Sequence, residues 1–310
     1  ENTFSSETPE WVAMDFQNTA PSGAVVGIDI NNAELISNTG NIVLNGLAGN
    51  EQGSCGVHLA NHSQIISKGK GKGAAALLID GKASAEIHNS FGVMINGVGS
   101  SLTTKDGNIT LKGDGTRGIS ILDGGAILST GVGTYAAKIS IDGRAGGGEN
   151  GCHGVLIAGE DSRVYAKDGE INIRGISDGT ADNNHGVYLS SGGRIESTGT
   201  KTFAASIKIE GISGVEGTEN THDFSSRGIA LWGANTGVFS SDGDISLKGT
   251  SRRSEKNGEG IYIADGSKII SAASITLEGK GFFHEGVVIT GEESTVSTIR
   301  GCISIIVKGC

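Results

Sequence analysis

The chain has 310 residues, a formal net charge of −10, 53 glycines, only 2 prolines, and 5% aromatic residues. The negative charge argues against nucleic acid and anionic membrane surfaces as partners, because both are themselves negatively charged. No apolar run approaches the roughly 18 residues of a membrane-spanning helix, so the sequence predicts no transmembrane segment. The chain opens at Glu1, without Met or a signal peptide, and we interpret it as a processed or excised segment.

A three-part repeat organises the chain after residue 26. Residues 1–26 are predicted to form an N-terminal segment or cap, because solenoid ends expose strand edges. From residue 27 to 310, each repeat opens with Gly-[Ile/Val]-x-[Leu/Ile/Met], continues with a second apolar step, and closes with [Ile/Leu]-x-[Ile/Leu]-x-Gly. The nine opening steps begin at Gly27, Gly56, Gly92, Gly118, Gly154, Gly186, Gly228, Gly260 and Gly286.

Each of the three steps alternates apolar residues with free positions, which is the period of a β-strand with one buried face. Three short strands in a repeat of this length are typical of one coil of a β-helix. Glycine before the first strand and after the third marks corners where the backbone needs space or a positive φ. The sequence therefore predicts an all-β fold, a parallel β-helix of about nine coils of three short strands.

A charge ladder supports this register. The residue before each closing Gly should stack on its counterpart one coil further along, about 4.8 Å away. From the second coil onward this position alternates in sign, so that each charge lies between two opposite charges. The ladder consists of Asp80, Lys112, Asp142, Arg174, Glu210, Lys248, Glu278 and Lys308.

The run from Gly186 to Gly199, with its closing step Ile207-Lys208-Ile209-Glu210-Gly211, resembles filamentous-haemagglutinin-like large exoproteins, a family of secreted bacterial β-helix adhesins. The resemblance extends over about Gly27 to Gly309. It implies a right-handed β-helix, secretion to the extracellular bacterial cell surface, and a role in adhesion or a surface layer. The expected partner is a ligand on a host cell, a neighbouring cell or a matrix, with no cofactor and no catalytic residue.

Four cysteines are compatible with export. Three coils separate Cys55 from Cys152, about 14 Å by strand spacing, which is too far for a disulfide. Cys302 and Cys310 bracket the last strand and can bond only if that segment curls into a loop. The family resemblance implies such a terminal loop in some members, whereas the strand pattern argues against it. A Cys302–Cys310 disulfide, an intermolecular bond and free thiols all stay open.

Histidines precede the first-strand Gly in two adjacent coils, at His153 and His185, with Cys152 beside them. Stacked neighbours of this kind could share a metal ion. Zinc requires three or four ligands, however, and the same position holds Arg227, Glu259 and other residue types in further coils. We therefore expect no metal site and interpret this position as a variable exposed column.

Insertions are expected at one corner, between the third strand of one coil and the first strand of the next. Four consecutive insertions lie at 144–153, 176–185, 212–227 and 250–259. Stacked coils should bring them together as one polar surface on a rigid scaffold, although loops are also tolerated there without a function. Deleting residues 212–227 is expected to reduce binding with little effect on thermal unfolding. The candidate binding residues are Glu149, Asn150, Asp178, Asp182, Asn183, Asn184, Glu219, His222, Asp223, Arg252 and Arg253.

Three classes of function remain. The first is an adhesin-like, non-enzymatic surface protein that presents the corner loops. The second is a structural subunit that joins end to end with copies of itself into an extracellular fibre or sheath. The third, a polysaccharide lyase or hydrolase, is least favoured, because the outward row that the pattern predicts for the third strands contains no carboxylate. That row is Val43, Leu78, Thr110, Ser140, Asn172, Lys208, Ser246, Thr276 and Ile306.

Overall fold

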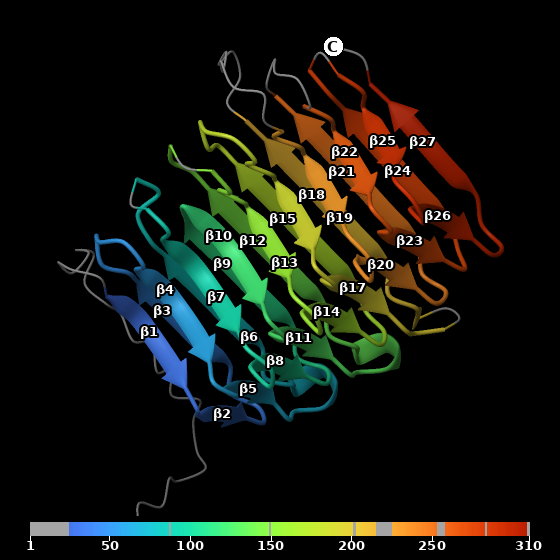
Figure 1. The fold of residues 1–310 in the computed structure, drawn as a ribbon. Coiled ribbons are helices and arrows are strands. Elements are labelled where there is room, and N and C mark those ends of the chain that lie inside the picture. The colour runs from blue at the N-terminus through green and yellow to red at the C-terminus, as the bar shows by residue number, and fades with distance from the viewer. Residues whose placement is uncertain are drawn as a thin grey trace, which may run out of the picture.

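The computed structural model confirms the predicted parallel β-helix, built from three sheets of nine parallel strands each (Figure 1). It describes residues 25–86, 88–148, 150–200, 203–214, 225–252, 258–282 and 284–308. Within this part of the chain, no helix is long and apolar enough to cross a membrane. The chain runs through one strand of each sheet per coil, so every strand pairs with strands of the neighbouring coils.

Each sheet collects one strand from every coil. The first sheet contains β1 (Val26–Asn31), β4 (Cys55–Ala60), β7 (Phe91–Asn96), β10 (Arg117–Leu122), β13 (Val155–Ala158), β16 (Val187–Ser190), β19 (Ile229–Trp232), β22 (Ile261–Ala264) and β25 (Val287–Thr290). The second contains β2 (Glu34–Ser37), β5 (Gln64–Ser67), β8 (Ser101–Thr104), β11 (Ala126–Ser129), β14 (Arg163–Ala166), β17 (Arg194–Ser197), β20 (Gly237–Ser240), β23 (Lys268–Ser271) and β26 (Thr295–Thr298). The third contains β3 (Ile42–Leu47), β6 (Leu77–Lys82), β9 (Ile109–Gly115), β12 (Ile139–Ala145), β15 (Ile171–Ser177), β18 (Ile207–Ser213), β21 (Ile245–Ser251), β24 (Ile275–Lys280) and β27 (Ile303–Val307).

The core is a continuous column of aliphatic side chains inside the three sheets. On β12, for example, Ile139 and Ile141 are buried, whereas Ser140 and Asp142 between and beyond them are exposed. Burying one such side chain contributes about 1.5–3 kcal/mol, and neighbouring coils share the same column. The alternation in the sequence thus becomes an inside and an outside for every strand.

Glycine is required where the third strand of one coil meets the first strand of the next. A Cβ placed on Gly175 of β15 would lie 2.0 Å from the carbonyl oxygen of Gly186, and one on Gly143 would lie 2.0 Å from that of Gly154. Real Cβ atoms essentially never approach a backbone atom that closely. The closing and opening glycines of the repeat are therefore set by close backbone approach.

The charge ladder has the predicted register from Asp80 to Glu278. The prediction is wrong at the last step, where Glu278 pairs with Ile306 rather than with Lys308. Val307 takes the place of the closing glycine, because it pairs with Gly279. Lys308 still reaches the carboxylate of Glu278, with Nζ 2.5 Å from Oε1. The residue that continues the outward row of Thr276 is accordingly Ser304, whereas Ile306 lies in the outward column of the charge ladder.

A second corner, between the second and third strands, alternates in length over coils two to seven and is short in the coils of β24 and β27; we call it the alternating corner. Nine residues precede β6, β12 and β18, whereas four precede β9, β15 and β21. The long loops before β6 and β12 contain the 3-10 turns η1 (Gly71–Gly73) and η2 (Gly133–Tyr135). An aspartate from the next, short loop holds each turn: Asp106 Oδ2 accepts from Gly71 N and Asp168 Oδ2 from Gly133 N, both at 2.7 Å.

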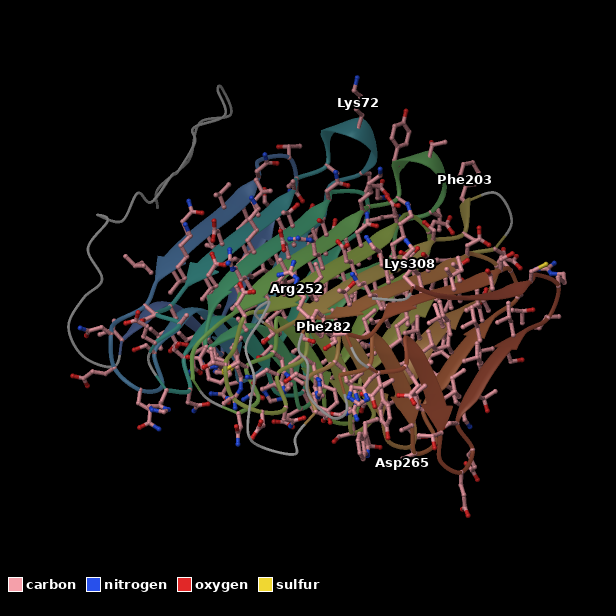
Figure 2. All side chains as sticks on the ribbon, turned by 90° about the horizontal axis from the view of Figure 1, so that it is seen from above. Lys72, Phe203, Arg252, Asp265, Phe282 and Lys308 are labelled. Atoms are coloured by element: carbon pink, nitrogen blue, oxygen red, sulfur yellow. The ribbon has the colours of Figure 1, made fainter. Side chains whose placement is uncertain are left out.

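The alternating corner corrects the expectation that insertions occupy a single corner. Figure 2 shows Lys72 and Phe203, from two of the long loops, along one edge of the molecule. The sequence contains a signal for this second corner: Gly-x-x-Thr-[Tyr/Phe]-Ala-Ala recurs at residues 131–137 and 199–205, in two of the long loops.

Candidate functional site

The predicted polar surface forms in part at the corner between the third strand of one coil and the first strand of the next, which we call the insertion corner. Asn150 and Asn183 are exposed there. Asp178 is half-buried and forms an ion pair with Arg144, with Nη2 2.7 Å from Oδ2. Arg252 is half-buried as well. These side chains can contact a partner.

Other predicted binding residues are buried in the loop or lie outside the described residues. Asn184 is fully buried; its Oδ1 accepts from Cys152 N at 2.7 Å and its Nδ2 donates to Ala181 O at 2.7 Å. Asp182 is buried as well. The Asn184 side chain therefore fixes the loop, and neither side chain faces solvent. The candidates that lie outside the described residues are Glu149, Glu219, His222, Asp223 and Arg253.

The position before each first-strand glycine forms a buried column, contrary to the exposed column that we expected. We call it the corner column. It is covered because the insertion loops fold over the corner, which the strand pattern does not reveal. Arg117 is half-buried and Glu285 exposed. The buried members are Cys55, Phe91, His153, His185, Arg227 and Glu259.

Two histidines of the corner column stack one coil apart. Their rings lie 5.2 Å apart and nearly parallel, and both tilt against the ring of Tyr188 at 4.9 Å. Nδ1 of His153 accepts from the backbone N of His185, and Nδ1 of His185 accepts from the backbone N of Arg227. Nε2 of His185 lies 2.9 Å from Oδ1 of Asn183, an acceptor. These contacts fit neutral imidazoles that carry the proton on Nε2.

Burial lowers the pKa of His153 to about 3 and lowers the pKa of His185 well below its usual range, with further lowering by nearby Arg117 and Arg227 respectively. The unfolded chain takes up protons at both groups first, as the pH falls through about 6.5. These histidines therefore stabilise the folded state above about pH 6.5. This stabilisation is lost as the pH falls from there towards 3.

We expect the free energy of unfolding to be about 4 kcal/mol lower near pH 5 than near pH 7, because each of the two histidines contributes about 1.4 kcal/mol per pH unit below about pH 6.5. Urea unfolding at the two pH values measures this difference. His153→Asn should reduce the pH dependence, whereas His62→Gln, at an exposed position, should leave it unchanged. Equal pH dependence in the wild type and His153→Asn would contradict the assignment.

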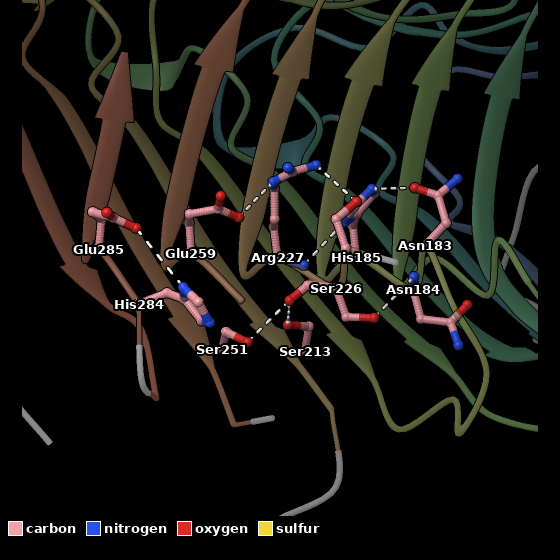
Figure 3. Close-up of polar contacts among 11 residues, drawn as sticks. Asn183, Asn184, His185, Ser213, Ser226, Arg227, Ser251, Glu259, His284 and Glu285 are labelled. Atoms are coloured by element: carbon pink, nitrogen blue, oxygen red, sulfur yellow. Dashed lines mark hydrogen bonds and ion pairs between the residues drawn. The ribbon is translucent and has the colours of Figure 1, made fainter. Parts of the chain in front are cut away.

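A buried ion pair continues the corner column in the next two coils (Figure 3). Nε of Arg227 lies 2.8 Å from Oε2 of Glu259, and the two side chains are 6% and 7% exposed. Nη1 of Arg227 donates to Oγ of Ser225 at 2.9 Å. The guanidinium also covers the ring of Tyr262, 3.7 Å from its centroid. Arg227 is thus neutralised and stacked, and it links the insertion corner to the outer face of the first sheet.

An aromatic patch lies beside this pair on the outer face of the first sheet. It consists of Tyr188 on β16, Trp232 on β19 and Tyr262 on β22. The rings of Trp232 and Tyr262 lie 5.6 Å apart, and Trp232 is 41% exposed. The sequence analysis missed these residues, although both tyrosines occupy the free position of the first-strand motif. Aromatic side chains with an exposed face are frequent anchors of binding sites.

A groove with a volume of about 480 Å³ crosses the outer face of the third sheet. Its walls are two columns of outward side chains on β12, β15, β18 and β21, and its floor is the chain at Ile141, Ile173 and Ile209. One wall consists of Ser140, Asn172, Lys208 and Ser246, and the other of Asp142, Arg174, Glu210 and Lys248.

Ion pairs connect the charges of the groove. Arg174 lies 3.6 Å from Asp142 and 3.2 Å from Glu210, and Lys248 lies 3.0 Å from Glu210. The hydrogen bond from Lys248, with help from Arg174, lowers the pKa of the Glu210 carboxyl. A catalytic acid requires a raised pKa, so this environment suits Glu210 to accept hydrogen bonds rather than to donate a proton.

The cysteine pairing proposed for the C-terminal segment does not fit the strand that follows Cys302. Residues Ile303–Val307 form the extended strand β27 instead of a loop, and Cys302 is exposed and free. Cys310 lies outside the described residues. Cys55 is a buried thiol, and burial raises its pKa to about 12. Among the described residues, no group of three or more His, Cys, Asp or Glu side chains could hold a metal ion.

Comparisons of the chain with protein-family models, curated proteins and solved structures found no match. The fold alone therefore assigns the class of protein, a parallel β-helix solenoid with three nine-stranded sheets. Function has to be argued from the surfaces described above, because this fold carries many unrelated functions.

Proposed function

We propose that this protein is a non-enzymatic, adhesin-like protein of the bacterial cell surface, secreted to the outside of the cell. Its insertion corner binds a ligand on a host cell, a neighbouring cell or a matrix. The observation that carries this proposal is the contact of exposed Asn183 with His185, which packs against Tyr188 of the aromatic patch that also contains exposed Trp232. A rigid scaffold that presents loops and exposed aromatic rings together is typical of binding proteins.

Binding of the purified protein to immobilised cells or matrix tests this proposal. The deletion of residues 212–227 that the sequence suggested is unsuitable, because Ser213, Ser226 and Arg227 are buried. Replacing residues 215–224 by a Gly-Ser linker keeps those three side chains. We expect this replacement, and Trp232→Ala, each to weaken binding about tenfold or more, the loss typical of a removed anchor residue.

Phe203→Ala is the matched control, because Phe203 is 47% exposed but lies at the alternating corner. Normal binding by both the linker variant and Trp232→Ala would refute the proposal. A second candidate, a subunit that joins end to end into a fibre, is favoured by the apolar side chains that β27 exposes, Ile303, Ile305 and Val307. Long fibres in negative-stain images of the same preparation, in place of single short rods, would support it.

A further inference from the structure

We propose that the groove on the third sheet binds an extended, uncharged glycan that lies along the axis of the β-helix. This inference rests on the proposed role in ligand binding, but it concerns a different surface from the insertion corner. It assigns a chemical class of ligand to that surface. The argument depends on the spacing of the groove, on its hydrogen-bonding groups and on its charge.

The groove repeats at the spacing of a parallel sheet. Asn172 pairs with Ser140 on one side and with Lys208 on the other, and Arg174 pairs with Asp142 and Glu210 in the same way. Each step along either wall is therefore one strand spacing, about 4.8 Å. A pyranose unit in an extended β-linked chain advances by about the same distance. Successive sugar units can thus meet successive coils, and every second unit has the same orientation.

The walls offer donors and acceptors together, as sugar hydroxyls require. Arg174, Lys208 and Lys248 donate, Glu210 accepts, and the Asn172 amide does both. Hydrogen bonds to charged groups contribute more than those between neutral groups, about 1.5–3 kcal/mol each. Ion pairs already hold Arg174 and Lys248 in place, so a ligand does not have to order these long side chains by itself.

The groove has only a small excess of positive charge, and its cations are already paired. Lys208 reaches Glu170 at its margin, with Nζ 2.5 Å from Oε1, and a hydrogen bond from Lys208 lowers the pKa of the Glu170 carboxyl. The lining has three cations, Arg174, Lys208 and Lys248, and two carboxylates, Asp142 and Glu210. Glu170 at the margin pairs with Lys208 and with Lys138. A polyanion such as nucleic acid would need an excess of unpaired cations. An uncharged chain needs no unpaired cation, so it fits a groove whose charges are already paired with one another.

A peptide fits this surface less well than a glycan. Strands that add to a sheet require an unpaired edge, whereas β12, β15, β18 and β21 each pair with a strand on both sides. An extended peptide laid across the strands advances about 3.3 Å per residue, which does not match the spacing of the coils. The spacing and the paired strands together favour the glycan.

Isothermal titration calorimetry of the whole protein with β-1,4-linked cello- and chito-oligosaccharides of increasing length tests this inference. We expect the affinity to increase with each sugar unit up to about four units, the number of coils that line the groove, and then to level off. Asn172→Ala and Lys208→Ala should each weaken binding about tenfold. Maltooligosaccharides, which coil instead of extending, should bind more weakly.

Thr110→Ala and Thr276→Ala are the matched controls, because these threonines continue the same column on β9 and β24 beyond both ends of the groove. Both should bind like the wild type. Absence of binding by any of the extended glycans, or equal losses in the control and groove variants, would refute the inference. Stronger binding of polyuronates, with a steep loss in salt, would refute it as well. The linker replacement at 215–224 should leave glycan binding unchanged, so the two proposals can fail separately.

Discussion

Gly175→Ala should lower the free energy of unfolding by at least about 3 kcal/mol, the upper range for overpacking a core. The added methyl group would meet the backbone oxygen of Gly186 at 2.0 Å and a side-chain carbon of Val187 at 2.7 Å. The Gly186 carbonyl accepts a hydrogen bond from Val155 N, so it cannot withdraw without breaking the pairing of the two coils. Denaturant unfolding followed by circular dichroism measures the loss.

Gly73→Ala provides the control for this substitution. Gly73 belongs to a turn at the alternating corner and does not have a positive φ, and a methyl group added to it would meet no other atom within 4 Å. The variant should unfold within about 0.5 kcal/mol of the wild type, as surface substitutions usually do. Similar losses at Gly175 and Gly73 would show that close approach is not the reason for the glycine in the repeat.

Arg227→Met should destabilise the protein by about 3–5 kcal/mol, because it leaves the carboxylate of Glu259 buried without its partner. It also removes the stacking on Tyr262. Arg174→Met, at an ion pair whose side chains are 46% and 35% exposed, should cost less than about 1 kcal/mol. Chemical denaturation of both variants measures the contrast.

The double substitution Arg227→Met with Glu259→Met separates the cost of an unpaired charge from the loss of packing. It should recover a large part of the stability lost in Arg227→Met, because apolar residues of similar volume often replace a buried ion pair without loss. If the double variant is as unstable as the single one, packing around Arg227 rather than the buried charge explains the effect.

The sequence predicts the strands and their register because both follow from periodicity. Alternating apolar positions define the inside of each strand, and Gly175 and its equivalents mark the corners. The predicted register is wrong at Lys308 because Val307, and not a glycine, pairs with Gly279. The pattern requires a closing glycine and therefore shifts this strand by two residues, to Gly309.

The insertion corner and the groove were harder to predict than the strands, because both depend on how loops and side chains of neighbouring coils pack. Nothing in the strand pattern shows that the insertion loops bury His185 and Glu259. The groove was not predicted because two outward columns form it together. Carboxylates such as Glu210 lie only in the column of the charge ladder and not in the column of Asn172. The pairing of Arg227 with Tyr262 crosses from a corner to a sheet face, which no local motif records.

Over coils two to seven, two features described above share a period of two coils: the sign of the charge ladder from Asp80 to Lys248, and the nine- and four-residue loops of the alternating corner. Duplicating or losing a single coil in this part would set like charges beside each other and would separate a long loop from the aspartate of the short loop that holds it. Duplicating or losing a pair would preserve both. Within coils two to seven, the unit by which this protein can be lengthened by design is therefore the double coil.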